Sequence, residues 1–292
     1  MIYVLTGATG SGKSSLAIEL AKRLDAEIIN GDAFQIYQGL MIATASPSEE
    51  EKKQVPHHLF NFLPLDSSYS IAQYQKDCRA AIADVLSRKD HVVIVGGSGL
   101  YLRAALYDYD LSLDTDKVDM SPFSSQSNEE LRAYLYSLDA DEAEKIPVQN
   151  RVRLLRSIRI CLASGKSKTS LLAEQKHAPI YSCSFFVLHV ERDILYPRVN
   201  ERVEKMFQDG LLEETIPLIK RYGRDIQAFK AIGVRELFPY IDGQMSLKET
   251  KEAIKKNTRH YIKRQETFFR HQFNAKQVAN LEDILPSEKA EE

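Results

Sequence analysis

The stretch GATGSGKS at residues 7–14 limits the possible fold more than any other part of the chain. An apolar segment, 2–6, precedes it, and an amphipathic helix is predicted over 14–24. The pattern G-x-x-x-x-G-K-[ST] between a strand and a helix is typical of a phosphate-binding loop, because glycines let backbone N–H groups turn toward phosphate oxygens at the positive end of the helix. The loop does not say which phosphate compound it holds. We expect the contacts to come from Gly7, Thr9, Gly10, Ser11, Gly12, Lys13 and Ser14, with the Ser14 hydroxyl as a ligand of a phosphate-bound Mg²⁺.

Predicted strands alternate with predicted helices over the first hundred residues. A second strand is expected at 27–30, a helix near 70–88, and a fully apolar strand at 91–95 that stops at a double glycine. This alternation predicts an α/β fold in which helices flank a parallel sheet of the P-loop NTPase kind.

Composition changes along the chain indicate four parts. Residues 1–111 are expected to form the α/β core and 112–182 a mostly helical insertion. Residues 183–275 then supply a return strand and several further helices of the core, and 276–292 form an acidic tail that we expect to fray.

The totals of the sequence exclude several classes of protein. The 292 residues carry a net charge of −2, so a nucleic-acid partner would have to be recognised by local charge. Three widely spaced cysteines indicate neither a disulfide framework nor a zinc site. No apolar run reaches the roughly 18 residues of a membrane span, and the first residues do not read as a signal peptide. We therefore expect a cytoplasmic protein that does not enter a membrane, and we take it to be a monomer.

Polar and glycine-rich segments follow three of the predicted strands and should meet at one edge of the sheet. An ATPase usually carries an acid after a second apolar strand, but 91–95 is followed by Gly96, Gly97 and Ser98. The acid is instead Asp32, which either caps a following helix or acts as a general base beside the phosphate. This arrangement favours transfer to a second substrate over hydrolysis.

One basic stretch lies in the predicted insertion. Residues 146–173 contain no acid, and Arg153, Arg156 and Arg159 recur every three residues on a predicted helix. Either they form a solvated helix face or they bind a polyanion. The apolar residues expected largely on the other side of this helix are Val152, Leu155, Ile158 and Leu162.

A second basic stretch runs from Lys248 to Arg270, with eight Lys or Arg residues against three Glu. Its aromatic residues Tyr261, Phe268 and Phe269 could pack inward or stack on unpaired bases. Two such stretches in a chain of net charge −2 favour a polyanionic partner such as RNA.

Taken in order, the motifs resemble the tRNA dimethylallyltransferase family, also called tRNA isopentenyl-pyrophosphate transferases, over most of the chain. Any one motif is weak, but the ordered set is specific. The matching segments are GATGSGKSSLAIELA, GDAFQIYQGL-x-IATASPS, VPHHLFN, VGGSGLYLRA, PRVNERVEKMFQDGLLEE, AFKAIGVRE and TRHYIKRQETFFR.

The resemblance implies that the loop holds the diphosphate of dimethylallyl diphosphate, with Mg²⁺, and that the five-carbon group moves to N6 of adenine 37 in the anticodon stem-loop of tRNA. The insertion would help to bind that tRNA. Asp32 matches the family's general base, Ser98 stands where a channel threonine does, and Arg202 matches an arginine on the diphosphate. The positions that match tRNA-contacting stretches are Asp32, Ala33, Phe34, Gln35, Ser98, Arg153, Arg156, Lys230, Ala231, Ile232, Gly233, Val234 and Arg235.

The chain departs from the family pattern at several positions. Ala8 replaces Pro, Ala43 replaces Gly, Ser46 replaces Lys, Asn61 replaces Asp, and Ser98 replaces Thr. Three other functions stay open from the residues: a small-molecule kinase that uses ATP, an adenylate isopentenyltransferase, and an RNA-binding paralogue with a weakened site.

Overall fold

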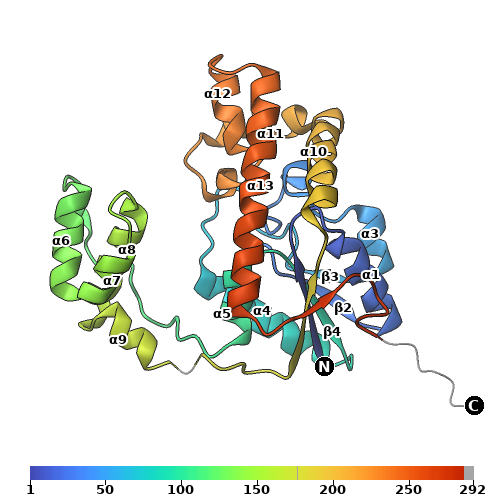
Figure 1. Ribbon diagram of the computed structural model, residues 1–292, viewed down its shortest axis with the longest axis horizontal. Coiled ribbons are helices and arrows are strands. Elements are labelled where there is room, and N and C mark those ends of the chain that lie inside the picture. Colours follow the sequence, from blue (N-terminus) through green and yellow to red (C-terminus); the bar gives the residue numbers. More distant parts are fainter. Residues whose placement is uncertain (176, 286–292) are drawn as a thin grey trace, which may run out of the picture. The chain divides into compact units, whose positions relative to one another are not determined.

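The computed structural model describes residues 1–175 and 177–285, which form two compact units (Figure 1). The first unit joins Met1–Leu106 to the chain from Tyr181 onward, and the second is Tyr107–Ile180, where 112–182 was expected from composition. Within the described residues, no helix combines the length and the apolar character needed to cross a membrane.

A six-stranded sheet is the centre of the first unit. Its strand order is β3-β2-β4-β1-β5-β6 and every neighbouring pair is parallel, so the predicted parallel α/β sheet is confirmed. The strands are β1 (Ile2–Gly7), β2 (Glu27–Asn30), β3 (His57–His58), β4 (Val92–Val95), β5 (Cys183–Leu188) and β6 (Lys276–Val278).

Helices cover both faces of this sheet. The helix α1 packs on the face that carries Leu5, Ile28 and Val93. Val4 and Ile94 point to the opposite face by strand alternation and are also fully buried, as expected for a parallel sheet. The helices of the unit are α1 (Lys13–Arg23), α2 (Met41–Thr44), α3 (Glu49–Gln54), α4 (Ile71–Leu86), α5 (Gly99–Leu106), α10 (Arg192–Gln208), α11 (Leu211–Tyr222), α12 (Phe238–Ile241) and α13 (Leu247–Gln272), with short 3₁₀ turns at Gln227–Lys230 and Arg235–Leu237.

The loops after β2 and β4 touch through their backbones. The Gly31 N–H donates to Val95 O at 2.7 Å, and a Cβ atom on Gly96 would lie 2.1 Å from the carbonyl carbon of Gly31. Only glycine allows this approach. The loops at the carboxyl ends of β2 and β4 are therefore closely packed against each other.

The frayed tail was predicted to begin at residue 276, but ordered structure continues beyond that residue. Residues 276–278 form β6, which pairs with β5, and Val278 and Ile284 are buried in the same core cluster as α1. The acidic residues of this stretch concealed its apolar positions, so the prediction is wrong for 276–285. Residues 286–292, the remainder of the predicted tail, lie outside the described residues.

The second unit is a small helical cluster with its own apolar core. Its helices are α6 (Asn128–Leu138), α7 (Ala140–Lys145), α8 (Arg151–Ser164) and α9 (Lys168–Ala173), after a 3₁₀ turn at Ser121–Phe123. The face of α8 turned toward the core carries Leu154, Ser157, Ile158 and Cys161.

The predicted apolar face of α8 was partly wrong. Ile158 is buried and Leu155 packs against the core cluster, as expected, but Val152 is 78% exposed and Leu162 is 38% exposed. The inward stripe follows the helical spacing of Leu154 and Ile158, so an apolar residue outside that stripe stays in solvent.

Candidate active site

The phosphate loop ends in a helix start that no side chain caps. Gly12 is the N-cap of α1 with φ 92°, and it offers no side chain to the first turn. By contrast, α3, α4, α6 and α13 begin with capping boxes. The N–H groups of Gly10, Gly12, Lys13 and Ser14 donate to no acceptor among the described residues. These N–H groups and the positive end of α1 are available to an anion.

The other predicted loop residues contribute differently. The Thr9 N–H donates to Gln265 Oε1 at 3.0 Å, and the Ser11 N–H donates to Ala8 O at 3.2 Å. Gly7 is the last residue of β1, and a Cβ atom there would lie 2.9 Å from Leu188 O. Thr9, Ser11 and Gly7 therefore shape the loop, and their amides are engaged or held within the sheet.

Two cations and one carboxylate meet at the loop. Burial lowers the pKa of Lys13 to about 8; Asp32 opposes this shift, and Arg202 adds to it. Burial also lowers the pKa of Arg202, which lies on α10, and Asp32 again opposes the change. Neither cation forms an ion pair with a described residue. An anion in the loop would therefore meet two desolvated positive charges.

Asp32 follows β2 and is held by its own turn. Its N–H donates to Asn30 Oδ1 at 2.8 Å, and its Oδ1 accepts from the Phe34 N–H at 2.9 Å. No helix begins here, since the next is α2 at Met41, so the helix-cap alternative is wrong. The second carboxylate oxygen accepts no hydrogen bond within the described chain, which leaves it able to take a proton.

Ser98 ties the loop after β4 to the loop of Asp32. Its Oγ accepts from the Ala33 N–H at 2.9 Å, and its N–H donates to Gly31 O at 3.1 Å.

Two tyrosines also lie close to Asp32. Burial, with a smaller contribution from Asp32, raises the pKa of Tyr101 to about 12 and also raises the pKa of Tyr261. Both hydroxyls therefore stay protonated at neutral pH.

The segment 230–235 borders the same region as Gln35. Gln35 Nε2 donates to Ala45 O at 2.8 Å, and a Cβ atom on Gly233 would lie 3.8 Å from Ala43 O. Lys230 and Arg235 are the exposed members of the segment, whereas Ala231, Gly233 and Val234 are buried and Ile232 is partly buried. Only the two cations can reach far into solvent.

Most of the basic residues predicted in the second unit have protein partners. Arg151 donates to four backbone or side-chain oxygens, Lys166 pairs with Glu174, and Lys168 pairs with Glu142. Arg159 lies 4.0 Å from Asp116. Exposed cations without a described partner in this stretch are Arg153 and Arg156.

Of the aromatic residues of α13, Phe268 and Phe269 pack against the first unit, which is one of the two alternatives left open by the sequence. Phe269 is buried, and the ring of Phe268 lies against Gly99. The basic residues of the helix differ in their surroundings. Lys251 and Lys255 pair with Glu204, whereas the exposed Lys263, Arg264 and His271 line a hollow of about 460 Å³ beside Phe268.

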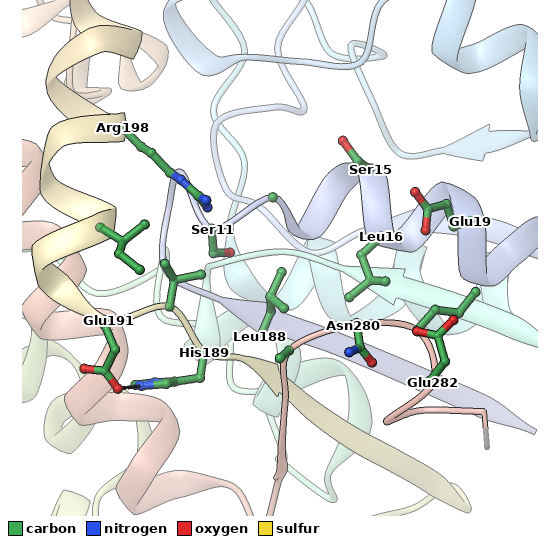
Figure 2. A pocket seen from close by; sticks show the side chains of 15 residues that line it. Ser11, Ser15, Leu16, Glu19, Leu188, His189, Glu191, Arg198, Asn280 and Glu282 are labelled. Atoms are coloured by element: carbon green, nitrogen blue, oxygen red, sulfur yellow. Dashed lines mark hydrogen bonds and ion pairs between the residues drawn. The ribbon is translucent and has the colours of Figure 1, made fainter. Parts of the chain in front are cut away.

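A larger hollow, of about 600 Å³, borders the phosphate loop at Ser11 and Gly12 (Figure 2). In this view Arg198 extends toward the loop near Ser11, and Glu19, Glu191 and Glu282 surround the hollow. Neither Asp32 nor Arg202 lines it. The residues suited to catalysis therefore meet outside this hollow, at the edge formed by the loops after β1, β2 and β4.

Comparison with known proteins identifies the family. A sequence profile described as IPP transferase matches residues 35–272. The chain belongs to the IPP transferase family. A tRNA dimethylallyltransferase of Anoxybacillus flavithermus is 42% identical over 273 residues, which are 93% of this chain and 88% of that protein.

Two solved structures agree with this membership. A tRNA delta(2)-isopentenylpyrophosphate transferase of Staphylococcus epidermidis matches with a TM-score of 0.70 at 35% identity, covering 96% of this chain and 93% of that one. A eukaryotic dimethylallyltransferase acting on tRNA matches with a TM-score of 0.82 at 28% identity, covering 92% of this chain and 69% of that one. The predicted resemblance to the IPP transferase family is confirmed.

Sequence reasoning missed Tyr101 and Gln265, and it named Tyr261 only as a residue that could pack inward or stack on bases. Tyr101 and Tyr261 lie beside Asp32, and Gln265 contacts the phosphate loop from 256 residues away. Tyr261 and Gln265 belong to the segment TRHYIKRQETFFR, which carried the resemblance, but the sequence contained no signal for what either side chain would contact.

Proposed function

We propose that this IPP transferase family member moves the dimethylallyl group of dimethylallyl diphosphate to N6 of adenine 37 in tRNA, releasing diphosphate. The observation that carries the proposal is the meeting of Lys13 and Arg202 with Asp32 at one edge of the sheet. A phosphate loop beside a carboxylate with a free oxygen suits transfer to an acceptor amine. The names of the relatives support the substrate class.

The leaving diphosphate is the part of the reaction that the protein can assist most. As the allylic C–O bond breaks, its electron pair moves onto the diphosphate oxygen. Lys13, Arg202 and the amides of Gly10, Gly12 and Ser14 would stabilise that charge. Preorganised donors of this kind are each worth about 3 kcal/mol in other enzymes.

Mg²⁺ fits this site only as an ion that the protein and dimethylallyl diphosphate would ligate together. The described residues contain no group of three or more His, Cys, Asp or Glu that could hold a metal by themselves. Ser14 is exposed at the first turn of α1, where its hydroxyl can join diphosphate oxygens as a ligand. Bound there, the ion would supply further neutralisation of the leaving group.

Asp32 would act on the acceptor. The N6 amine attacks the allylic carbon, a new N–C bond forms, and the free carboxylate oxygen of Asp32 takes the proton that the amine loses. Ser98 Oγ accepts a hydrogen bond from the Ala33 N–H and so fixes the loop that carries Asp32.

The tRNA would be held by exposed cations, most of which have no partner among the described residues. These are Arg153 and Arg156 of the second unit and Lys230 of the first, together with Arg235, whose Nε donates to Glu236. The outer face of α13 adds Lys263 and Arg264. Positions Asp32 to Gln35, Ser98 and the backbone of Ala231 to Val234 would border the acceptor base.

Labelled dimethylallyl diphosphate and unmodified tRNA test the proposal. Label in tRNA supports it, whereas label in AMP alone indicates an adenylate isopentenyltransferase. Consumption of ATP without tRNA indicates a small-molecule kinase, and RNA binding without any transfer indicates a paralogue with a weakened site.

Substitution of Asp32 tests its assignment as the general base. Asp32→Asn should slow transfer by about 10²- to 10⁴-fold, because the amide cannot take the proton. Its affinity for tRNA should stay close to that of the wild type in a filter-binding assay. A variant that transfers at the wild-type rate would remove Asp32 from this role.

A further inference from the structure

Gln265 of α13 joins the donor side and the acceptor side of the site. Its Oε1 accepts from the Thr9 N–H of the phosphate loop at 3.0 Å, and its Nε2 donates to Gly97 O of the loop after β4 at 3.0 Å. The residue is 4% exposed. One buried side chain therefore connects two loops that are distant in sequence.

The partners fix the orientation of this amide. The Thr9 N–H can only donate and the Gly97 carbonyl can only accept, so the opposite orientation would break both hydrogen bonds. A Cβ atom on Gly97 would lie 2.1 Å from Gln265 Nε2, which leaves room only for glycine. Tyr261, one turn earlier on α13, also reaches Gly97 O, at 3.4 Å.

The connection continues to the carboxylate. Gly97 precedes Ser98, whose Oγ accepts from the Ala33 N–H, and Ala33 follows Asp32. On the other side, Thr9 lies within the loop that carries Lys13. A path of hydrogen bonds and peptide links thus runs from the loop that carries Lys13 to the loop that carries Asp32.

We propose that Gln265 is a positioning residue that sets the distance between the bound diphosphate and Asp32. It touches neither substrate in this role, and the inference rests on the proposed function. Its two hydrogen bonds have different roles. The hydrogen bond with Thr9 shapes the phosphate loop, and the hydrogen bond with Gly97 positions the loop after β4. A misplacement of about 1 Å can cost about 100-fold in rate.

Two substitutions separate these bonds. Gln265→Glu keeps an acceptor for the Thr9 N–H but sets a carboxylate oxygen against Gly97 O. Gln265→Leu removes both hydrogen bonds. We expect Gln265→Glu to bind dimethylallyl diphosphate like the wild type and to transfer about 10- to 100-fold more slowly in a single turnover. Gln265→Leu should lose donor affinity as well as rate.

The pH dependence of Gln265→Glu gives a rescue that a purely structural residue would not show. Burial raises the pKa of a carboxyl group, and the protonated form can donate to Gly97 O as the amide does. The rate of the variant, divided by that of the wild type at the same pH, should therefore rise as the pH is lowered. A ratio that is independent of pH overturns the proposal.

Ile254→Ala is the matched control, because Ile254 is buried on the same helix but far along it from Gln265. It should lower the melting temperature without changing the single-turnover rate. If both Gln265 variants, once folded, transfer at the wild-type rate, the positioning role is wrong.

Exchange of the Thr9 amide hydrogen, followed by NMR, needs no turnover and separates this inference from the proposed function. The amide should be protected in the wild type and in Gln265→Glu, and should exchange faster in Gln265→Leu. Equal exchange in all three proteins overturns the proposal even if the wild type is active.

Discussion

At the scale of single residues, Lys13 gives the site a pH dependence that can be measured. Burial lowers the pKa of Lys13 to about 8, so the ammonium is charged below that pH and neutral above it. We expect kcat/KM for dimethylallyl diphosphate, which reports the free enzyme, to fall as the pH rises through this value.

Lys13→Arg is the control for that prediction, since a guanidinium keeps its charge throughout the range. The variant should have a lower kcat/KM overall, because the shape of the side chain differs, but its alkaline decline should be absent. An identical decline in both proteins would assign the pH dependence to another group.

Ser46 and Asn61 illustrate what a single sequence cannot reveal about its own departures. Each differs from the family pattern, and nothing in the sequence links the two. In the structure, Asn61 Nδ2 donates to Ser46 Oγ at 3.0 Å and to Tyr37 O at 3.0 Å. The two positions that depart from the family pattern are therefore in direct contact through a neutral hydrogen bond.

Asn61→Asp should therefore be destabilising by itself. The carboxylate cannot donate to Tyr37 O or Ser46 Oγ, and we expect a loss of about 1–3 kcal/mol in the free energy of unfolding. Adding Ser46→Lys should restore part of that loss, with a coupling energy of about 0.5–3 kcal/mol in a double-mutant cycle measured by urea denaturation. Strictly additive effects would show that the positions are independent.

At the scale of elements, the ends of β2, β3 and α4 are held by one buried carboxylate. Glu27 of β2 accepts from Arg88 Nη2 at 2.8 Å and lies 2.6 Å from His58 Nε2 of β3. The hydrogen bond from Arg88, beyond the end of α4, is the largest cause that lowers the pKa of Glu27. Glu27→Gln should lower the free energy of unfolding at neutral pH by about 1–3 kcal/mol, because it removes the charge-assisted hydrogen bonds with Arg88 and His58, although Arg88 keeps its ion pair with Asp84.

The sign of the pH effect follows from the lowered pKa of Glu27. A carboxylate of this kind stabilises the fold above its unfolded-state pKa and loses that contribution as the pH falls through its folded-state pKa. The difference between the wild type and Glu27→Gln should shrink below about pH 4. The exposed Glu50→Gln should have little effect at any pH; a similar loss there would point to net charge instead.

Elements with a clear period were predictable, and elements made by tertiary contact were not. The apolar run 91–95 and the periodic helix near 70–88 correspond to β4 and α4. The two-residue strand β3 has no period of its own, and it exists because its backbone pairs with Ile28 and Ile29 of β2. The strand β6 likewise has no period of its own and exists because its backbone pairs with β5.

At the scale of the whole molecule, the cations available to a partner depend on which of them already form ion pairs or hydrogen bonds, and not on their number alone. The sequence showed two basic stretches, but it could not show which cations already had carboxylate or carbonyl partners. Arg151, Lys166 and Lys168 are engaged within the second unit, whereas Arg153 and Arg156 have no partner among its described residues. The capacity to bind RNA should follow the unpaired cations.

Arg153→Ala and Arg156→Ala should each weaken tRNA binding across substrates and reduce the slope of log Kd against log salt concentration by about 1. Affinity for dimethylallyl diphosphate should not change. Lys166→Ala is the matched control, because it removes the same charge from the same unit but from an ion pair with Glu174. Equal changes of slope for Arg153→Ala and Lys166→Ala would mean that net charge, and not the unpaired arginines, governs binding.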